Sequence, residues 1–230
     1  MREIVLDTET TGFDPESGDR IVEIGAVELM RHVPSGNTYH QYINPKRSMP
    51  EDAFQVHGLG DEFLSDKPVF AEIAQDFVDF IGDAKLVIHN AAFDIKFLNA
   101  ELGWVGRPKI PWDQAIDTLA IARKKFPGSP ASLDALCRRY GIDNSSRTLH
   151  GALLDSEILA EVYLEMIGGR QPDFGLSSPL AGTTTTEDGK AWRPGPRSTP
   201  LAPRGSEEER AAHREFIAKI GDGALWSKFS

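Results

Sequence analysis

The chain has 230 residues, 40% of them hydrophobic, which allows one full globular domain with an appended segment but not two ordinary domains. Its single cysteine, Cys137, excludes an intrachain disulfide and a cysteine-based metal site. The formal net charge of −10 argues against tight nonspecific binding to duplex phosphates, because that affinity depends on lysine and arginine.

The acidic surplus lies entirely in residues 1–170, which hold 17 Lys and Arg against 27 Asp and Glu, whereas residues 171–230 hold 8 of each. A nucleic acid substrate would therefore need metal ions to offset part of this charge. The chain begins without the basic and apolar regions of a signal peptide, and no eighteen apolar residues run together. We expect a cytoplasmic protein that does not enter a membrane.

The first part of the chain is expected to form three strands and then a helix. The strands are predicted at residues 4–6, 20–29 and 38–44, and their short connections favour an antiparallel meander. Residues 68–81 place apolar side chains at helical spacing, and Gly82 follows where a C-cap belongs.

Strands and helices are expected to alternate after Gly82. A strand is predicted at residues 85–89, a helix from about 92 to 102 and a further strand near 110–115. Helices are predicted around residues 132–140 and 152–167. Strands followed by alternating strands and helices indicate an α/β domain with a mixed sheet, spanning residues 1–170.

The first candidate site is Asp7-Thr8-Glu9, at the end of the first expected strand. Residues two apart on a strand point to the same face, so the two carboxylates would lie roughly 6.5 to 7 Å apart along the chain. Like charges repel, and a hard cation such as Mg²⁺ removes that repulsion while preferring oxygen ligands. A lone Asp-x-Glu pair is more often a solvated strand edge or a helix cap.

The second candidate is Asp94, which follows the apolar strand 85–89 and the polar residue Asn90. Active-site groups of open α/β sheets gather beyond the C-terminal ends of the strands, which is where this order puts Asp94. The structural alternative makes Asn90 a helix N-cap and Asp94 a first-turn acid favoured by the helix dipole. Local evidence alone favours that alternative.

The third candidate pairs His150 with Asp155. Asp155 extends an apolar, core-facing helical stripe through Leu159, Val162 and Met166, and a buried carboxylate is costly unless it is paired or bound to a metal. His150 lies five residues earlier, about 140° away around an ideal helix, so it must sit on the preceding loop. A lone histidine there is usually a surface or capping residue, but its proximity to a candidate ligand favours a functional role.

The three segments together resemble, in order and spacing, the exonuclease motifs of the DEDD superfamily, in the subtype whose last motif carries histidine. The matching segments are Asp7-x-Glu9, Asn90-x-x-Phe93-Asp94 and His150-x-x-x-x-Asp155. The resemblance extends over roughly residues 2–167. It implies a ribonuclease-H-like fold with a five-stranded mixed sheet flanked by helices, and 3′-to-5′ exonuclease activity.

The resemblance also implies the roles of the site residues. Two divalent ions, Mg²⁺ or Mn²⁺, would be bound by Asp7, Glu9, Asp94 and Asp155, and His150 would be the general base. The family's substrate contacts fall on Thr8, Thr10, Gly12, Val56, His57 and Asn90. For His57, a helix-terminal histidine before a Gly58 C-cap is an equally supported alternative.

The composition changes after the domain. Of the 36 residues from 171 to 206, 20 are Gly, Pro, Ser or Thr, which predicts a flexible linker. Residues 207–230 begin with a capping box from Ser206 to Glu209. They then carry the apolar side chains of Phe216, Ile220, Leu225, Trp226 and Phe229. So short a segment cannot form its own core, so we expect it to dock on another protein rather than fold back on its own domain.

Gln171, Phe174 and Leu176 resemble the bacterial sliding-clamp-binding pattern. A catalytic domain, clamp-like peptide, linker and apolar end occur in this order in the proofreading subunits of bacterial replicative polymerases. That resemblance implies a DNA 3′ end as substrate and the polymerase alpha subunit and sliding clamp as partners, with a theta-type small subunit in some bacteria. Two alternatives are an RNA 3′-exonuclease and a catalytically idle adaptor between clamp and polymerase.

Overall fold

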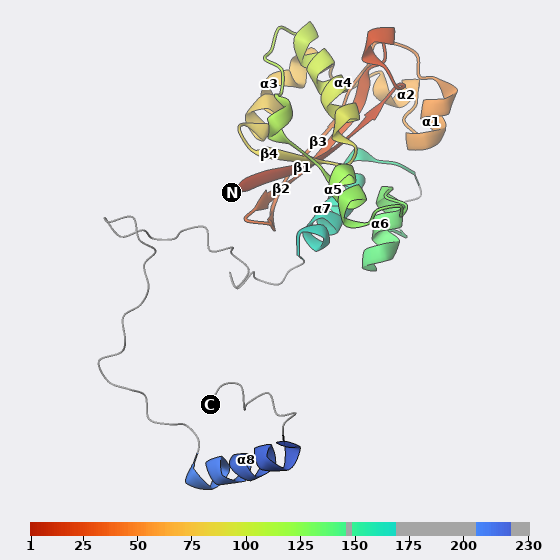
Figure 1. Ribbon diagram of the computed structural model, residues 1–230. Coiled ribbons are helices and arrows are strands. Elements are labelled where there is room, and N and C mark those ends of the chain that lie inside the picture. Colours follow the sequence, from red (N-terminus) through yellow and green to blue (C-terminus); the bar gives the residue numbers. More distant parts are fainter. Residues whose placement is uncertain (146–148, 169–205, 222–230) are drawn as a thin grey trace, which may run out of the picture. The chain divides into compact units, whose positions relative to one another are not determined.

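The computed structural model describes residues 1–145, 149–168 and 206–221 (Figure 1). The chain divides into two units, Met1–Asp173 and Phe174–Ser230. The clamp-like peptide and most of the expected linker lie outside the described residues. Within the described parts, no helix combines the length and apolar character needed to cross a bilayer.

The first unit is built on a five-stranded sheet. The strands are β1 (Arg2–Thr10), β2 (Ile21–Met30), β3 (Val33–Tyr42), β4 (Lys85–Ile88) and β5 (Ala115–Asp117). Their order is β3-β2-β1-β4-β5; the first three are antiparallel neighbours, and β4 is parallel to both β1 and β5. The predicted meander and mixed sheet are therefore confirmed.

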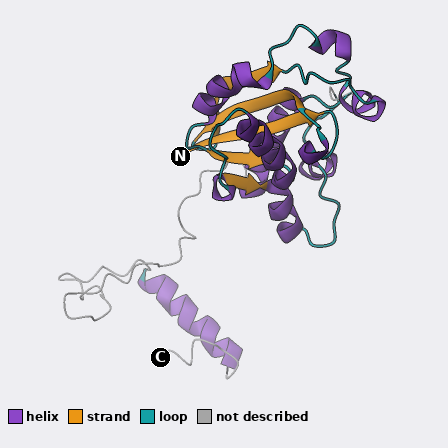
Figure 2. Cartoon of the chain, turned by 90° about the horizontal axis from the view of Figure 1, so that it is seen from above, coloured by secondary structure: helices purple, strands orange, loops and turns teal. Residues whose placement is uncertain are grey.

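Helices cover both faces of the sheet (Figure 2). On β1, Leu6 is buried in the cluster that also holds Phe97 of α4 (Ala91–Trp104). The neighbouring residue Val5 is instead buried with Leu159. Because successive strand residues point to opposite faces, even-numbered side chains of β1 face α4 and odd-numbered ones face the helix that carries Leu159.

The helix that carries Leu159 is α7 (Ala152–Ile167), and it packs against β1 and β2. On the other face, α3 (Phe70–Ile81) ends at Gly82, whose amide donates to the Val78 carbonyl, so the predicted C-cap is confirmed. The domain is completed by α6 (Leu133–Tyr140), which packs against α7.

Part of the predicted secondary structure is wrong. The last strand begins at Ala115, not near residue 110, because Pro111 has no amide hydrogen to donate to a strand ladder and the chain forms a 3-10 turn at Trp112–Gln114. Two short helices, α2 (Asp61–Leu64) and α5 (Thr118–Lys125), were not predicted, since each buries too few side chains to show a clear period. A third, α1 (Glu51–His57), was indicated only by the alternative that ends a helix at His57.

The second unit contains α8 (Glu207–Ile220). Its N-terminus has the predicted capping box: Glu209 donates its amide to the Ser206 side chain, and the Glu209 carboxylate accepts from the Ser206 amide. None of the residues described in this helix is buried.

Candidate active site

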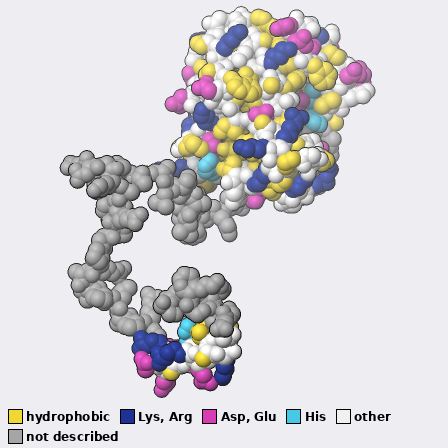
Figure 3. Space-filling view, viewed as in Figure 1, with side chains coloured by type: hydrophobic (Ala, Val, Ile, Leu, Met, Phe, Trp, Pro, Cys, Tyr) yellow, Lys and Arg dark blue, Asp and Glu magenta, His cyan; other side chains and the backbone are white. Residues whose placement is uncertain are grey.

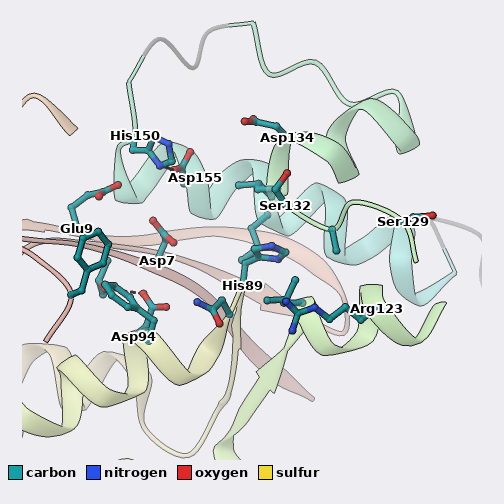
Figure 4. Close-up of a pocket in the computed structure, with 18 residues that line it drawn as sticks. Asp7, Glu9, His89, Asp94, Arg123, Ser129, Ser132, Asp134, His150 and Asp155 are labelled. Carbon is teal, nitrogen blue, oxygen red and sulfur yellow. Dashed lines mark hydrogen bonds and ion pairs between the residues drawn. The ribbon is translucent and has the colours of Figure 1, made fainter. Parts of the chain in front are cut away.

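Three elements bring the candidate carboxylates together at one edge of the sheet. β1 and β4 are parallel neighbours, so their C-terminal ends meet at the same edge. Asp7 and Glu9 lie in the C-terminal half of β1, and Asp94 lies in the first turn of α4, directly after β4. Asp155 lies in the first turn of α7. All four line one cavity of about 820 Å³ together with His150 (Figure 4).

Successive side chains of β1 point to opposite faces of the sheet, so the candidate residues of this strand contact different helices. Asp7 and Glu9 are odd-numbered and continue the face that α7 covers. Thr8 is even-numbered and faces α4, where its hydroxyl donates a 2.7 Å hydrogen bond to Asp94 Oδ1. The predicted common face for Asp7 and Glu9 thus points them at the helix that carries Asp155.

Glu9, His150 and Asp155 form the tightest group of potential metal ligands among the described residues. One ligand atom from each lies within 4.8 Å of the others. His150 Nδ1 is 3.5 Å from Asp155 Oδ2. Glu9 and Asp155 are buried while His150 is exposed, so the imidazole stands between the carboxylates and solvent.

Burial controls the protonation of Asp94. Its carboxyl is 3% exposed, and this desolvation raises its pKa to about 7, against the lowering effect of the Thr8 hydrogen bond. The neighbouring charge of Asp117 raises the pKa further. A carboxyl buried in this way is fully ionised near neutral pH only when a nearby cation offsets the cost of burying its charge.

The loop that carries His150 is held by the end of α1. The His150 amide donates to the Val56 carbonyl at 3.1 Å. Gly58, whose φ is +73°, packs so closely on Leu149 that an added Cβ would lie 2.8 Å from Leu149 Cδ1. His150 therefore lies on a loop before α7, as predicted, with its backbone anchored to a different element.

The comparisons with known proteins agree with this geometry. A family model described as Exonuclease matches residues 4–163. The chain is 50% identical over 223 residues to the DNA polymerase III subunit epsilon of Rickettsia felis, covering 96% of this chain and 97% of that protein. It is 48% identical over 240 residues to the subunit of the same name from Escherichia coli K12, covering 98% and 97%.

The chain belongs to the DNA polymerase III epsilon family of exonucleases. Its activity is that of a 3′-to-5′ exonuclease, as the three motifs predicted. The family's fold uses divalent metal, and the all-oxygen set of Asp7, Glu9, Asp94 and Asp155 suits such an ion.

Solved structures of exonucleases share the fold of this epsilon-family chain. Exonuclease X in complex with 5′ overhanging duplex DNA is 25% identical with a TM-score of 0.56, covering 72% of this chain and 90% of that one. The nuclease domain of 3′hExo, a DEDDh family member bound to rAMP, is 20% identical with a TM-score of 0.62, covering 72% and 91%. The predicted ribonuclease-H-like sheet is thereby confirmed.

The predicted substrate contacts fall into two groups. Thr8 and Asn90 line the cavity, whereas the lining does not include Thr10, Gly12, Val56 or His57. The Thr10 hydroxyl donates to the Gly12 carbonyl and so shapes the turn after β1. All six remain predictions as substrate contacts.

The sequence also left a structural alternative open for His57, as the end of a helix, and for Asn90, as a helix N-cap. His57 does end α1 before a left-handed Gly58, it is 5% exposed, and burial lowers its pKa. Its Nδ1 accepts from the Leu59 amide. Asn90 occupies the N-cap position of α4 and Asp94 its first turn, as the alternative predicted, but the Asn90 side chain makes no capping hydrogen bond there.

Several cavity residues were not predicted from the sequence: Phe13, His89, Phe93, Arg123, Ser129, Ser132 and Asp134. His89 lies directly before Asn90, and its Nδ1 is 2.9 Å from the Thr118 hydroxyl. Burial lowers the pKa of His89, which favours the neutral form of its ring. Arg123 was missed because α5, which carries it, was not predicted. A basic run at residues 123–125 was the signal for it.

Proposed function

We propose that the chain hydrolyses the terminal phosphodiester at DNA 3′ ends with two divalent ions, Mg²⁺ or Mn²⁺, held by Asp7, Glu9, Asp94 and Asp155. The observation that carries this proposal is the convergence of four carboxylates from β1, α4 and α7 on one cavity. Four carboxylates in one place repel one another. Bound cations that prefer oxygen ligands would relieve this repulsion. When bound, the ions supply charge neutralisation and activation of water.

His150 is proposed as the general base. Its imidazole is 49% exposed at the mouth of the group formed with Glu9 and Asp155, so it can meet an incoming water. The unperturbed pKa of histidine lies near neutral pH, which suits removal of a proton from that water. The backbone hydrogen bond to Val56 holds the loop in place while the ring accepts the proton. The product is a nucleoside 5′-monophosphate.

Proofreading during replication is the proposed biological role. The relatives are named as subunits of DNA polymerase III, and the chain matches nearly their full length. We propose that residues 1–170 are the exonuclease domain, 171–206 a flexible linker and 207–230 the segment that binds the polymerase alpha subunit. About 30 residues of such a linker span on the order of 30 Å, which raises the local concentration of the nuclease at the primer end.

The remaining partners rest on sequence resemblance. Gln171, Phe174 and Leu176 are the proposed sliding-clamp contacts, and they lie outside the described residues. Leu225, Trp226 and Phe229 lie outside them too, whereas Phe216 and Ile220 are exposed on α8. A theta-type subunit is proposed as an optional partner. Since the relatives are bacterial replication subunits, we propose that the protein works in the cytoplasm.

A nuclease assay tests the catalytic proposal. The full chain is incubated with Mg²⁺ or Mn²⁺ and a 3′-labelled primer that is paired, mispaired at its end, or made of RNA. Faster release of a mononucleotide from the mispaired DNA than from paired DNA or RNA is expected, and a chelator should stop it. Preference for RNA would support the alternative RNA 3′-exonuclease, and inactivity on every primer would support the idle adaptor.

A binding assay tests the polymerase proposal. The full chain and residues 1–205 are each mixed with the polymerase alpha subunit and separated by size. The full chain is expected to co-elute with alpha and the truncated chain to elute alone, while both cleave short DNA. Equal association of the two chains would remove residues 207–230 from the interface.

A further inference from the structure

The active-site cavity continues beyond the carboxylates. Figure 4 shows Asp7, Glu9, Asp94, Asp155 and His150 around one end, while Arg123 and Ser129 lie at the other end with His89 between. Arg123 comes from α5, and Ser132 begins α6. Among the residues described as lining the cavity, Arg123 is the only lysine or arginine.

Two other cations, one on α5 and one on α6, are engaged within the domain. Lys125 Nζ donates to the Met166 carbonyl, and Arg139 stacks on the ring of Phe126 at 4.2 Å. In contrast, no hydrogen bond or ion pair among the described residues involves the guanidinium of Arg123. Lysine and arginine side chains gather over α5 and α6 on the face shown in Figure 3, in an otherwise acidic domain.

Ser132 offers a second donor nearer the middle of the cavity, beside Asp134 (Figure 4). Its Oγ accepts the Ala135 amide at 3.3 Å as the N-cap of α6. The hydroxyl hydrogen of Ser132 is therefore left to donate to a ligand. The planar guanidinium of Arg123 suits the oxygens of a phosphodiester.

The chemistry of the proposed reaction identifies which phosphate reaches this end. A terminal nucleotide brings only one phosphate, the scissile one, and that group must lie at the carboxylate end. Any phosphate at the Arg123 end therefore belongs to a nucleotide on the 5′ side. We propose that Arg123 binds a phosphodiester of the substrate strand on the 5′ side of the scissile bond.

This inference rests on the proposed function, and two substrates separate the two ideas. Thymidine 5′-(p-nitrophenyl phosphate) carries only the scissile phosphate, whereas oligothymidylate also carries phosphates on the 5′ side. For Arg123→Ala, KM for oligothymidylate should rise on the order of tenfold, because one charge-assisted contact is lost. The loss of kcat/KM on the nitrophenyl ester should be several-fold smaller.

Salt dependence gives a readout that a structural role would not move. The slope of log KM against log salt for oligothymidylate should fall by about 0.7 in Arg123→Ala, since one fewer counterion is released from a single strand. Arg123→Lys should recover most of this slope and part of the affinity. Lys124→Ala is the matched control, because it removes an exposed cation from the next position of α5 that does not line the cavity.

The possible results are distinguishable. Equal losses on both substrates would overturn the proposal and assign Arg123 to the scissile phosphate. No loss on either would leave Arg123 as a solvated cation favoured by the end of α5. An effect of Lys124→Ala as large as that of Arg123→Ala would reduce the contact to general electrostatics. If the wild-type chain cleaves neither substrate, it is the proposed function that fails.

Discussion

Two helices of similar length, α7 and α8, differ in how the chain fixes them. α7 has 16 residues and buries ten, including Asp155, so the core determines where its first turn lies. α8 has 14 residues and buries none, and Phe216 is 61% exposed. An isolated helix of that length is marginal in water. Packing against the sheet therefore positions Asp155, whereas the described residues of α8 bury no side chain that could fix this helix.

The largest expected effect tests whether α7 carries the chemistry. Asp155→Asn should reduce cleavage of oligothymidylate by at least on the order of a thousandfold, because a ligand for the catalytic metal is lost. Its thermal midpoint without metal should match or exceed that of the wild type, since a buried carboxylate is neutralised. Deletion of residues 206–230 should leave this cleavage unchanged.

Substantial activity in Asp155→Asn would show that α7 is only a structural helix. A loss of cleavage on deletion of residues 206–230 would show that the C-terminal segment takes part in catalysis. Both outcomes are read from initial rates on the same short substrate.

The second prediction concerns the contact that seats α7 on β2. A Cβ added at Gly25 would lie 2.1 Å from the Leu153 amide nitrogen and 2.2 Å from the Ala152 carbonyl carbon. Gly25→Ala must therefore displace the first turn of α7, which also carries Asp155. We expect destabilisation of about 1–3 kcal/mol or more in urea unfolding, with most of the cleavage lost.

Gly103→Ala is the matched control for this substitution. Gly103 lies in α4, and an added Cβ meets no atom within 4 Å. The control should be neutral or gain roughly 0.5–1 kcal/mol from helix propensity. Equal stability of Gly25→Ala and the wild type would show that packing against β2 does not fix α7.

The third prediction uses the buried carboxyl of Asp94. Burial raises its pKa from the ordinary aspartate value of 3.8 to about 7 in the folded chain, so the folded state binds the proton more tightly. The resulting stability is fully present below about pH 4 and is lost as the pH rises through about 7. In a chelator, the thermal midpoint should fall across this window in the wild type and much less in Asp94→Asn.

Adding Mg²⁺ to the same experiment tests whether Asp94 binds the metal. Metal binding displaces the proton from Asp94, so stabilisation by Mg²⁺ should grow from pH 5 to pH 8. A Mg²⁺-induced shift of the thermal midpoint that is constant over this range would remove Asp94 from the metal site.

The sequence was most informative where long-range packing and local pattern agree. The alternation of β1 and the stripe from Asp155 to Met166 both reflect burial on one face, and both elements were predicted. The separation of the motif residues along the chain did not hide the site, because β1 and β4 end at the same edge of the sheet. The common site was indicated by the resemblance to the exonuclease motifs, since local evidence alone favoured a structural role for Asn90 and Asp94.

The sequence was least informative for the short elements that complete the cavity. α5 buries only Thr118 and Ala122, so no apolar period marks it, and Arg123 was missed with it. The anchoring of His150 to Val56 is a contact between backbone atoms 94 positions apart, which no side-chain pattern records. Pro111, which has no amide hydrogen for a strand ladder, argues against a strand at residues 110–115.

The smallest expected effect on catalysis belongs to α8. The double substitution Phe216→Ala with Ile220→Ala removes the two large apolar side chains that this helix exposes, yet it touches no residue of the cavity. Cleavage of oligothymidylate should stay within about twofold of wild type. Association with the polymerase alpha subunit, measured by titration, should weaken at least tenfold, because exposed aromatic and aliphatic anchors dominate such interfaces.

Arg214→Ala, which removes an exposed ion pair with Glu207 on the same helix, is the control and should retain association. If the double variant binds alpha as well as wild type does, α8 is not the docking element. The exposure of all described residues of α8 could then not be explained by binding to the alpha subunit.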